Sequence, residues 1–205
     1  MPKAFSEQEK EIIRAQMREK GRKLFEKQGL RKTTVEELAA AAAISKGAFY
    51  IFFDSKEELY MEIMEEIERD IHNQIMAFAM QPDGNAQANI SNLLKNFLFT
   101  MDDTPILKNF SRADLDYLVR KLPPERVLQH TDNDVAFMQL FLERIKQEGI
   151  PVKASPQVIS DLIKSLFFIS LHREDFNNDG YENMYHVLID LVAGYIAGVN
   201  HAESD

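Results

Sequence analysis

The chain has no cysteine among its 205 residues. This absence excludes a disulfide scaffold, a thiolate metal site and a cysteine nucleophile, and it is compatible with a reducing compartment. No run reaches the roughly 18 uncharged apolar residues that a membrane span requires, and the N-terminus contains no apolar signal core. The sequence therefore predicts a cytoplasmic protein that is neither secreted nor membrane-bound.

Patterns that serve catalysis are also missing. The five histidines are scattered, without His-x-x-x-His or Glu-x-x-His spacing, and no glycine-rich phosphate loop follows a strand. Asp114 and Asp116, like Asp132 and Asp134, are two residues apart and would point in different directions on a helix. We therefore expect no catalytic residues, no metal site and no cofactor.

Charge is distributed unevenly along the chain. The net charge is -9, yet the segment from Met1 to Lys56 holds 12 lysines and arginines against 8 acidic residues. A basic N-terminal segment on an acidic chain suits a protein that places one end on phosphate groups. Ordinary solvated helix faces would give the same distribution, so charge alone leaves both interpretations open.

Apolar residues recur three and four positions apart, and alternating strand patterns are missing, which predicts an all-α fold. Ser, Thr and Glu residues in capping-box spacing mark the starts of helices. The expected N-terminal helices are Ser6 to Gln28, Thr34 to Ala42, a short helix within residues 43–53, and Lys56 to about Phe78.

Turn residues divide the rest of the chain into further helices. These are expected at Asn85 to Met101, Pro105 to Phe110, Arg112 to Leu122, Pro124 to Glu148, Pro156 to Phe176 and Tyr181 to Val199. The expected organisation is a three-helix, helix-turn-helix domain at residues 1–54 and a larger helical domain at residues 55–205. The first helix of the second domain would connect the two.

The segment 43–53 has the layout of a DNA recognition helix. Ile44, Phe49 and Phe53 are spaced to pack against the preceding short helix. This packing leaves polar and small side chains to project outward from the N-terminal half of the helix. The residues expected to face DNA there are Ser45, Lys46, Gly47, Ala48 and Tyr50.

Each of these residue types has a contact to offer. Lys46 can meet a phosphate or a guanine edge, the Ala48 methyl can touch a thymine methyl, and the Tyr50 hydroxyl can donate to a phosphate. Thr34 and Lys56 stand at helix starts, where backbone N–H groups and the helix dipole favour an anion. Both are therefore expected to anchor backbone phosphates.

Residues 33–59 read TTVEELAAAAAISKGAFYIFFDSKEEL, which resembles the DNA-binding signature of the TetR family over about 50 residues. The resemblance implies an all-α homodimer in which a variable C-terminal domain binds a small molecule. Effector binding would move the fourth helix, separate the two recognition helices and release the operator. Most members of the family are repressors.

Three residues depart from the family pattern. Ala43 stands where the turn glycine is usual, so the turn either takes a positive φ at some cost or changes shape. Phe52 stands where tyrosine or histidine is usual and cannot make a polar phosphate contact. Asp54 brings a carboxylate near the DNA side, so phosphate affinity is expected to rest on Tyr50, Lys56 and Thr34.

The last two helices are the expected dimer interface, in a four-helix arrangement between protomers. Gly194 and Gly198 would either allow two helices to cross closely or let the helix end fray. The interface residues predicted from the apolar spacing are Val158, Leu162, Leu166, Ile169, Val187, Leu188, Leu191 and Tyr195.

Aromatic and methionine residues of the middle helices are candidates for the lining of an effector pocket, with plain core packing as the alternative. The candidates are Phe97, Met101, Phe110, Tyr117, Phe137, Met138, Phe141 and Phe168. They favour a small hydrophobic or amphipathic effector.

The sequence thus predicts a sequence-specific regulator that binds double-stranded operator DNA, most simply a homodimeric repressor released by a small molecule. Two alternatives stay open. One is a regulator that responds to a protein partner or lacks an effector, and the other is an all-α enzyme or carrier. Specific duplex binding separates both regulators from the enzyme or carrier.

Overall fold

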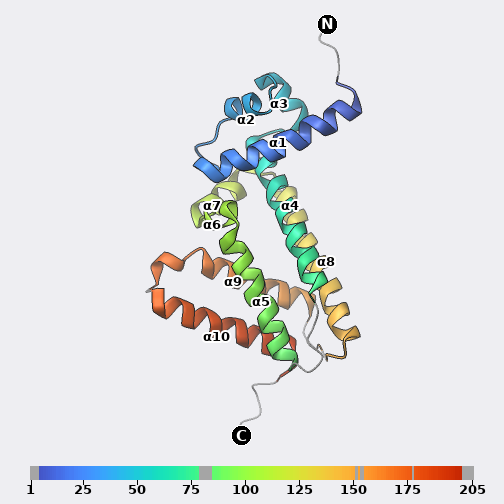
Figure 1. Ribbon diagram of the computed structural model, residues 1–205, viewed down its shortest axis with the longest axis vertical. Coiled ribbons are helices and arrows are strands. Elements are labelled where there is room, and N and C mark those ends of the chain that lie inside the picture. The colour runs from blue at the N-terminus through green and yellow to red at the C-terminus, as the bar shows by residue number, and fades with distance from the viewer. Residues whose placement is uncertain (1–4, 79–84, 151, 153–154, 177, 200–205) are drawn as a thin grey trace. The chain divides into compact units, whose positions relative to one another are not determined.

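A computed structural model describes residues 5–78, 85–150, 152, 155–176 and 178–199. These residues form helices and contain no strand, which confirms the all-α fold class (Figure 1). The helices are α1 (Glu7–Gln28), α2 (Val35–Ala41), α3 (Lys46–Phe52), α4 (Lys56–Ala77), α5 (Ala86–Asp103), α6 (Pro105–Lys108), α7 (Arg112–Lys121), α8 (Pro124–Gln147), α9 (Pro156–Ser170), the 3₁₀ turn η1 (Arg173–Asp175) and α10 (Asn178–Ile196).

One expected helix is shorter than its sequence pattern. The helix predicted from Pro156 to Phe176 ends at Ser170, where the hydroxyl donates to the Phe167 carbonyl at 2.7 Å. The amide of His172 then bonds the Ile169 carbonyl, a tighter spacing than that of an α-helix. The chain continues into η1 instead of a further α-helical turn.

The chain forms two compact units, which we call the N-terminal unit (Met1–Asp70 and Thr104–Pro123) and the C-terminal unit (Ile71–Asp103 and Pro124–Asp205). Helix α4 begins in the first unit and continues into the second. This division differs from the expected one at residue 54, because the start of α4 and the segment with α6 and α7 pack with α1 to α3.

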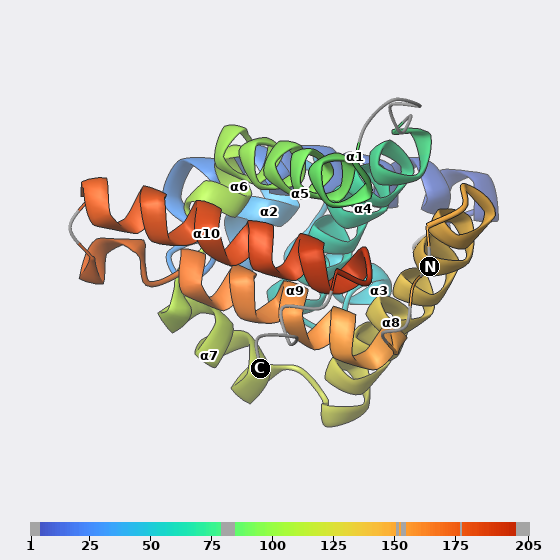
Figure 2. The same ribbon diagram turned by 90° about the horizontal axis from the view of Figure 1, so that it is seen from below.

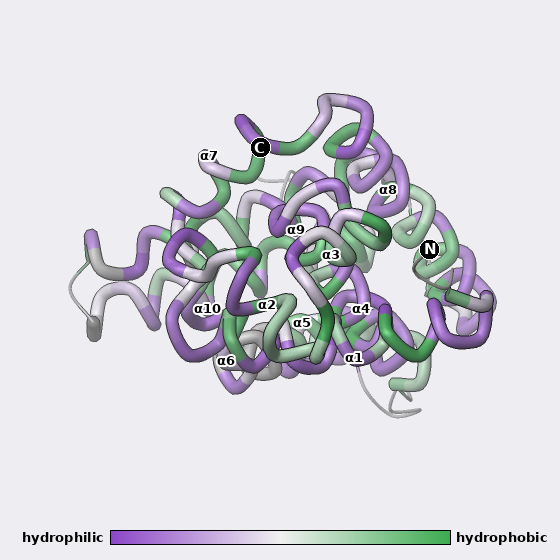
Figure 3. The backbone as a smooth tube through the Cα atoms, turned by 90° about the horizontal axis from the view of Figure 1, so that it is seen from above, coloured by the Kyte–Doolittle hydropathy of each residue, from purple (hydrophilic) through white to green (hydrophobic). Residues whose placement is uncertain are grey.

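The N-terminal unit is built around a close approach at Gly21 on α1. A Cβ atom at this position would lie 3.1 Å from Cδ2 of Leu59 and 3.4 Å from Cδ2 of Leu38. Met17 and Phe25 are buried on the same side of α1, one turn away in each direction. Figure 3 shows hydrophilic (purple) and hydrophobic (green) segments alternating along the helices of this unit. The core of the N-terminal unit therefore includes residues from the first turns of α4.

Ion pairs also fasten α1 along α4. Glu62 of α4 accepts hydrogen bonds from Arg14 and, at 2.9 Å, from Nη1 of Arg18. Burial alone would raise the pKa of Glu62, but the hydrogen bonds from both arginines outweigh burial and lower it. The Arg14 guanidinium also lies 4.6 Å from the ring centre of Phe53. These directional contacts restrict sliding that apolar packing alone would permit.

The C-terminal unit has a core from α5, α8, α9 and α10, and α9 and α10 run side by side (Figure 2). Asp190 of α10 binds the Ser91 hydroxyl and, at 2.9 Å, the Lys95 ammonium, both on α5. The Ser91 hydrogen bond, followed by the one from Lys95, lowers the pKa of Asp190. No described helix is long and apolar enough to span a membrane.

The turn between α2 and α3 holds Ala43 at a φ of 57°. The amide of Ala43 bonds the Ala40 carbonyl at 3.0 Å, and the amide of Ile44 bonds the Ala39 carbonyl at 3.0 Å. Of the two possibilities open at this position, the structure confirms the positive φ. The turn between α2 and α3 therefore has a positive φ at a residue that carries a Cβ atom.

We expect Ala43→Gly to raise the free energy of unfolding by about 0.5–1 kcal/mol. A Cβ atom in this region costs roughly 1–2 kcal/mol, which glycine avoids. Glycine also has a higher conformational entropy in the unfolded chain, and this offsets part of the stabilisation. Urea unfolding followed by circular dichroism measures the difference. Ala40→Gly, inside α2, is the control and should lose about 1 kcal/mol. A less stable Ala43→Gly variant would contradict the assignment of strain to this turn.

Candidate nucleic-acid interface

The starts of α2 and α3 are fixed by side-chain caps. Oγ1 of Thr34 accepts from the Glu37 amide at 3.2 Å, while the Glu37 carboxylate accepts from the Thr34 amide at 2.8 Å. Oγ of Ser45 accepts from the Ala48 amide at 3.1 Å. The hydroxyls of Thr34 and Ser45, both predicted DNA contacts, thus cap the N-terminal ends of α2 and α3. Both residues are exposed.

Helix α3 buries one side and exposes the other. Phe49 is completely buried and Phe53 nearly so, while Tyr50 is 49% exposed. The predicted DNA-facing residues Ser45, Lys46 and Gly47 are exposed as well, and Ala48 is half-buried. The packing predicted for α3 is therefore found, and its N-terminal half is open to a partner.

Two apolar residues at the end of α3 add features that the sequence did not indicate. Ile51 is 60% exposed, although sequence reasoning gave it no role. Phe52 is half-buried, with its ring centre 5.8 Å from that of Phe5, just before α1. Phe52 therefore belongs to the rim of the core and connects the N-terminal segment to α3.

Lys46 is paired with an acidic neighbour that the sequence analysis missed. Its Nζ atom lies 2.6 Å from Oε1 of Glu36, in the first turn of α2, and both side chains are more than half exposed. The hydrogen bond from Lys46 lowers the pKa of Glu36, and the same bond raises the pKa of Lys46. A partner of Lys46 must therefore replace or share this carboxylate.

Lys56 makes contacts within the chain that the sequence did not predict. Its ammonium donates to the carbonyl oxygens of Leu30 at 2.9 Å, Arg31 at 3.1 Å and Thr33 at 2.7 Å. Burial lowers the pKa of Lys56. The side chain is thus used to hold the loop between α1 and α2 against the start of α4. A phosphate at this position would meet the backbone N–H groups of α4 rather than the ammonium.

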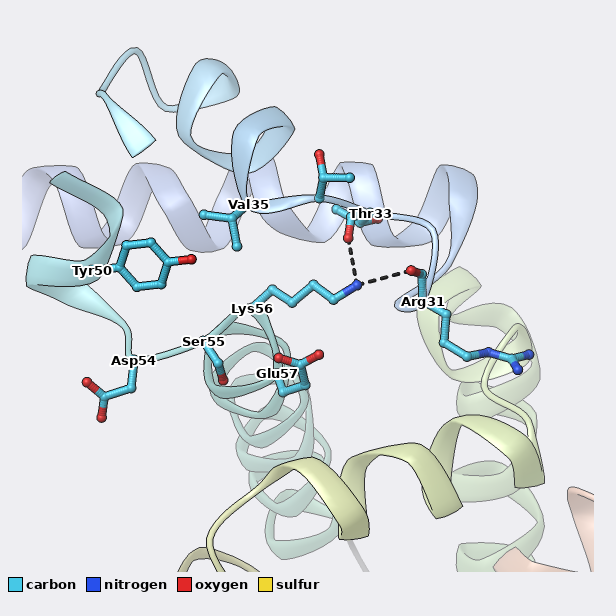
Figure 4. Close-up of a pocket in the computed structure, with 9 residues that line it drawn as sticks. Arg31, Thr33, Val35, Tyr50, Asp54, Ser55, Lys56 and Glu57 are labelled. Carbon is cyan, nitrogen blue, oxygen red and sulfur yellow. Dashed lines mark hydrogen bonds between the residues drawn. The ribbon is translucent and has the colours of Figure 1, made fainter. Parts of the chain in front are cut away.

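A pocket of about 280 Å³ lies between the start of α2, the end of α3 and the start of α4. It is lined by Arg31, Thr33, Thr34, Val35, Tyr50, Asp54, Ser55, Lys56 and Glu57. In Figure 4 the Tyr50 ring extends toward Val35, and the Asp54 carboxylate points away from Lys56. The fold therefore brings together the three predicted phosphate anchors Thr34, Tyr50 and Lys56.

The residues predicted to line an effector pocket fall in both units. In the N-terminal unit, Phe110 packs with its ring centre 6.2 Å from that of Tyr60, and Tyr117 donates to Glu57. In the C-terminal unit Phe137 and Phe141 are buried core residues, Phe97 and Met138 are partly buried, Phe168 is exposed, and the Met101 side chain lies outside the described part. Their role in effector binding stays a prediction.

The residues predicted for the dimer interface include both buried and exposed side chains. Leu166 is buried in the core of its own chain, where its carbonyl accepts from the Tyr185 hydroxyl at 3.0 Å, which corrects its assignment to an outer face. Leu162, Ile169 and Leu188 are partly buried against the same core, whereas Val158, Val187, Leu191 and Tyr195 are exposed. Gly198, with φ of 72°, follows the end of α10, so this glycine terminates the helix.

The fold and the exposed edge of α3 define an all-α helix-turn-helix protein. Residues 18–63 match the family described as bacterial regulatory proteins, tetR family. The HTH-type transcriptional regulator YuxN of Bacillus subtilis is 47% identical over 60 residues, which cover 29% of this chain. Residues 18–63 are therefore similar to the DNA-binding segment of the TetR family. The match spans only 19% of the length of YuxN, about a fifth.

Solved structures extend the likeness to the whole fold. A TetR-family transcriptional regulator from Pectobacterium atrosepticum has a TM-score of 0.69 at 18% identity, with 94% of this chain and 97% of that chain covered. RolR, solved in complex with resorcinol, has a TM-score of 0.60 at 15% identity, with 98% of both chains covered. At these identities the likeness concerns the fold.

We expect Lys56→Met to lower the free energy of unfolding by about 1–3 kcal/mol, because three carbonyl oxygens lose a charged donor. Urea unfolding measures the loss. Lys32→Met is the control, since Lys32 is exposed in the same loop. Equal stability of the two variants would show that the ammonium does not hold the loop.

Proposed function

We propose that this protein is a sequence-specific DNA-binding regulator, and that it acts in the cytoplasm as a homodimeric repressor released from its operator by a small molecule. The observation that carries the proposal is the exposed N-terminal half of α3, within the segment that matches the TetR family. A helix with one buried and one exposed side, held by a preceding short helix, suits insertion into the major groove.

The exposed edge of α3 offers several kinds of base and phosphate contact. Lys46 reaches a guanine edge or a phosphate once its pairing with Glu36 opens, and Gly47 allows close approach of the backbone. The half-buried methyl of Ala48 suits a thymine methyl. In this arrangement specificity comes from a few small side chains and from the shape of the duplex.

In this proposal, the backbone phosphates of DNA are bound by residues at the edge of the pocket near the start of α4. The exposed Tyr50 donates its hydroxyl, and the N-terminus of α2 at Thr34 offers backbone N–H groups. Lys56 supports this rim by holding the loop in place. Asp54 and Glu57 limit the positive potential there, so binding is expected to depend on geometry as well as on charge.

The proposed dimer uses the outer face of α9 and α10. Val187, Leu191 and Tyr195 follow one another at four-residue spacing along α10, and all are exposed in the single chain. Val158 of α9 is exposed as well. A contiguous apolar stripe of this kind on a soluble protein favours burial against a second copy. Two copies would present two α3 helices to half-sites about 34 Å apart.

The proposed effector is a small hydrophobic or amphipathic molecule. RolR, which shares the fold, was solved with resorcinol, a small aromatic compound. The C-terminal unit of this chain holds an aromatic cluster at Phe137 and Phe141 beside the partly buried Met138, which offers apolar and adaptable lining. Release follows if the effector binds the DNA-free state more tightly than the DNA-bound state.

Selection of bound duplexes from a randomised library, followed by gel shifts at two salt concentrations, tests DNA recognition. We expect one enriched sequence and an affinity that falls steeply with salt. Lys46→Gln should weaken binding and reduce the salt slope by about one. Glu36→Gln should tighten binding roughly two- to five-fold, because it removes a competitor of phosphate. Enrichment of no sequence by the wild-type chain would overturn the proposal.

Leu191→Glu is expected to convert the dimer into a monomer and to lower operator affinity by at least tenfold, because a carboxylate cannot be buried unpaired in the interface. Sedimentation velocity measures the mass. Leu128→Glu on α8, also at an exposed leucine, is the matched control. A dimer that survives Leu191→Glu and dissociates with Leu128→Glu would move the interface to α8.

A further inference from the structure

Helix α7 lies far along the chain from the helix-turn-helix segment, yet it belongs to the N-terminal unit. The segment Thr104–Pro123 that contains it is joined at both ends to the C-terminal unit, at Asp103 and at Pro124. Any rearrangement of the C-terminal unit therefore reaches this segment through the backbone. What α7 contacts in the N-terminal unit decides whether such a movement has consequences for DNA.

The first contact of α7 is a hydrogen bond from Tyr117 to Glu57. The Tyr117 hydroxyl lies 2.5 Å from Oε1 of Glu57, which directly follows Lys56 in the first turn of α4 and is only 7% exposed. Burial, followed by the bond to Glu57, raises the pKa of Tyr117 to about 12. The hydroxyl therefore stays protonated and donates to the carboxylate at any physiological pH.

The second contact joins α7 to the loop before α2. Nε of Arg31 lies 3.1 Å from Oδ1 of Asp114, in the first turn of α7. The other oxygen of Asp114 accepts from the Ser111 amide at 3.1 Å and so closes the cap of α7. Since the Arg31 carbonyl also accepts from Lys56, α7 holds the loop and the start of α4 at the same time.

The Tyr117 ring adds a third contact, because Nζ of Lys56 lies 5.9 Å from its centre and Nζ of Lys121 lies 6.0 Å from it. The residues that α7 contacts, Arg31, Lys56 and Glu57, all line the pocket that contains Thr34 and Tyr50. None of the α7 residues lines that pocket. Helix α7 therefore supports the phosphate-anchoring residues indirectly, through three residues that line the pocket.

We propose that α7 is a latch on the DNA-binding surface, in which Tyr117 and Asp114 act as positioning residues for Thr34 and Tyr50. The proposal rests on the proposed function and names the route by which the C-terminal unit regulates it. With the latch closed, the loop before α2 and the start of α4 hold the geometry that suits two phosphates. Displacement of α7 releases the loop before α2 and the start of α4. Operator affinity then falls, although no residue that contacts DNA has changed.

The test uses the full chain carrying Tyr117→Phe or Asp114→Asn, with Val119→Ala on the exposed side of α7 as the control. We expect each latch variant to weaken operator binding roughly three- to thirty-fold. The slope of log affinity against log salt should not change, because no phosphate contact is lost. Amide exchange in residues 29–34 should become faster in both variants and stay unchanged in Val119→Ala.

A role in folding alone predicts a lower melting temperature with unchanged operator affinity below it, and that result would overturn the latch. A reduced salt slope would also overturn it, by making these residues direct contacts. If Tyr117→Phe fails to fold, a double-mutant cycle of Arg31→Met and Asp114→Asn, measured by operator affinity, tests the latch instead. Equal losses in the single and double variants support the latch, and additive losses reject it. A wild-type chain that selects no DNA sequence rejects the proposed function instead.

Discussion

Lys56 donates to three carbonyl oxygens of the loop before α2, and so it ties the start of α4 to the start of the helix-turn-helix. A partly buried ammonium is stable when its N–H groups have acceptors, and the loop carbonyls need donors for the same reason. The arrangement meets both needs with one side chain. The pocket rim, the position of Thr34 and the contacts of α7 all depend on that junction.

The electrostatics of the chain follow from local pairing rather than from net charge. In a protein of charge -9, Arg14 and Arg18 of α1 are paired with Glu62 and Glu66 of α4, and Lys46 is paired with Glu36. Paired cations contribute little field at a distance, so a phosphate must compete for Lys46 at close range. Under the proposed function, such a surface would disfavour nonspecific association and favour a duplex that brings a phosphate close to Lys46.

Much of the fold was predictable because local rules determine it. The caps at Ser6 and Thr34 begin their helices, and the spacing of Phe49 and Phe53 identifies the buried side of α3. The sequence left a positive φ or a changed turn open for Ala43, and the structure shows the positive φ. Each of these features depends on a few neighbouring residues, which a single sequence displays directly.

The remaining features depend on contacts between residues far apart in the chain. The place of Lys56 at a helix start predicted a phosphate-anchoring role, and only the fold shows that its ammonium donates to the carbonyls of Leu30, Arg31 and Thr33. Spacing placed Leu166 in an interface stripe, whereas the fold buries it in the core of its own chain. Its aromatic character made Tyr117 a pocket candidate, and only the fold shows that its hydroxyl donates to Glu57. Periodicity identifies an apolar face without naming its partner.

The missing side chain at Gly21 sets the crossing distance of α1 and α4, since Leu59 already occupies the space that a Cβ would need. The side chains of Leu59 and Ile63 on α4 pack directly against the backbone of α1 at this glycine. Close-packed interiors leave little free volume, so a larger residue at position 21 would force these side chains or the two helices apart.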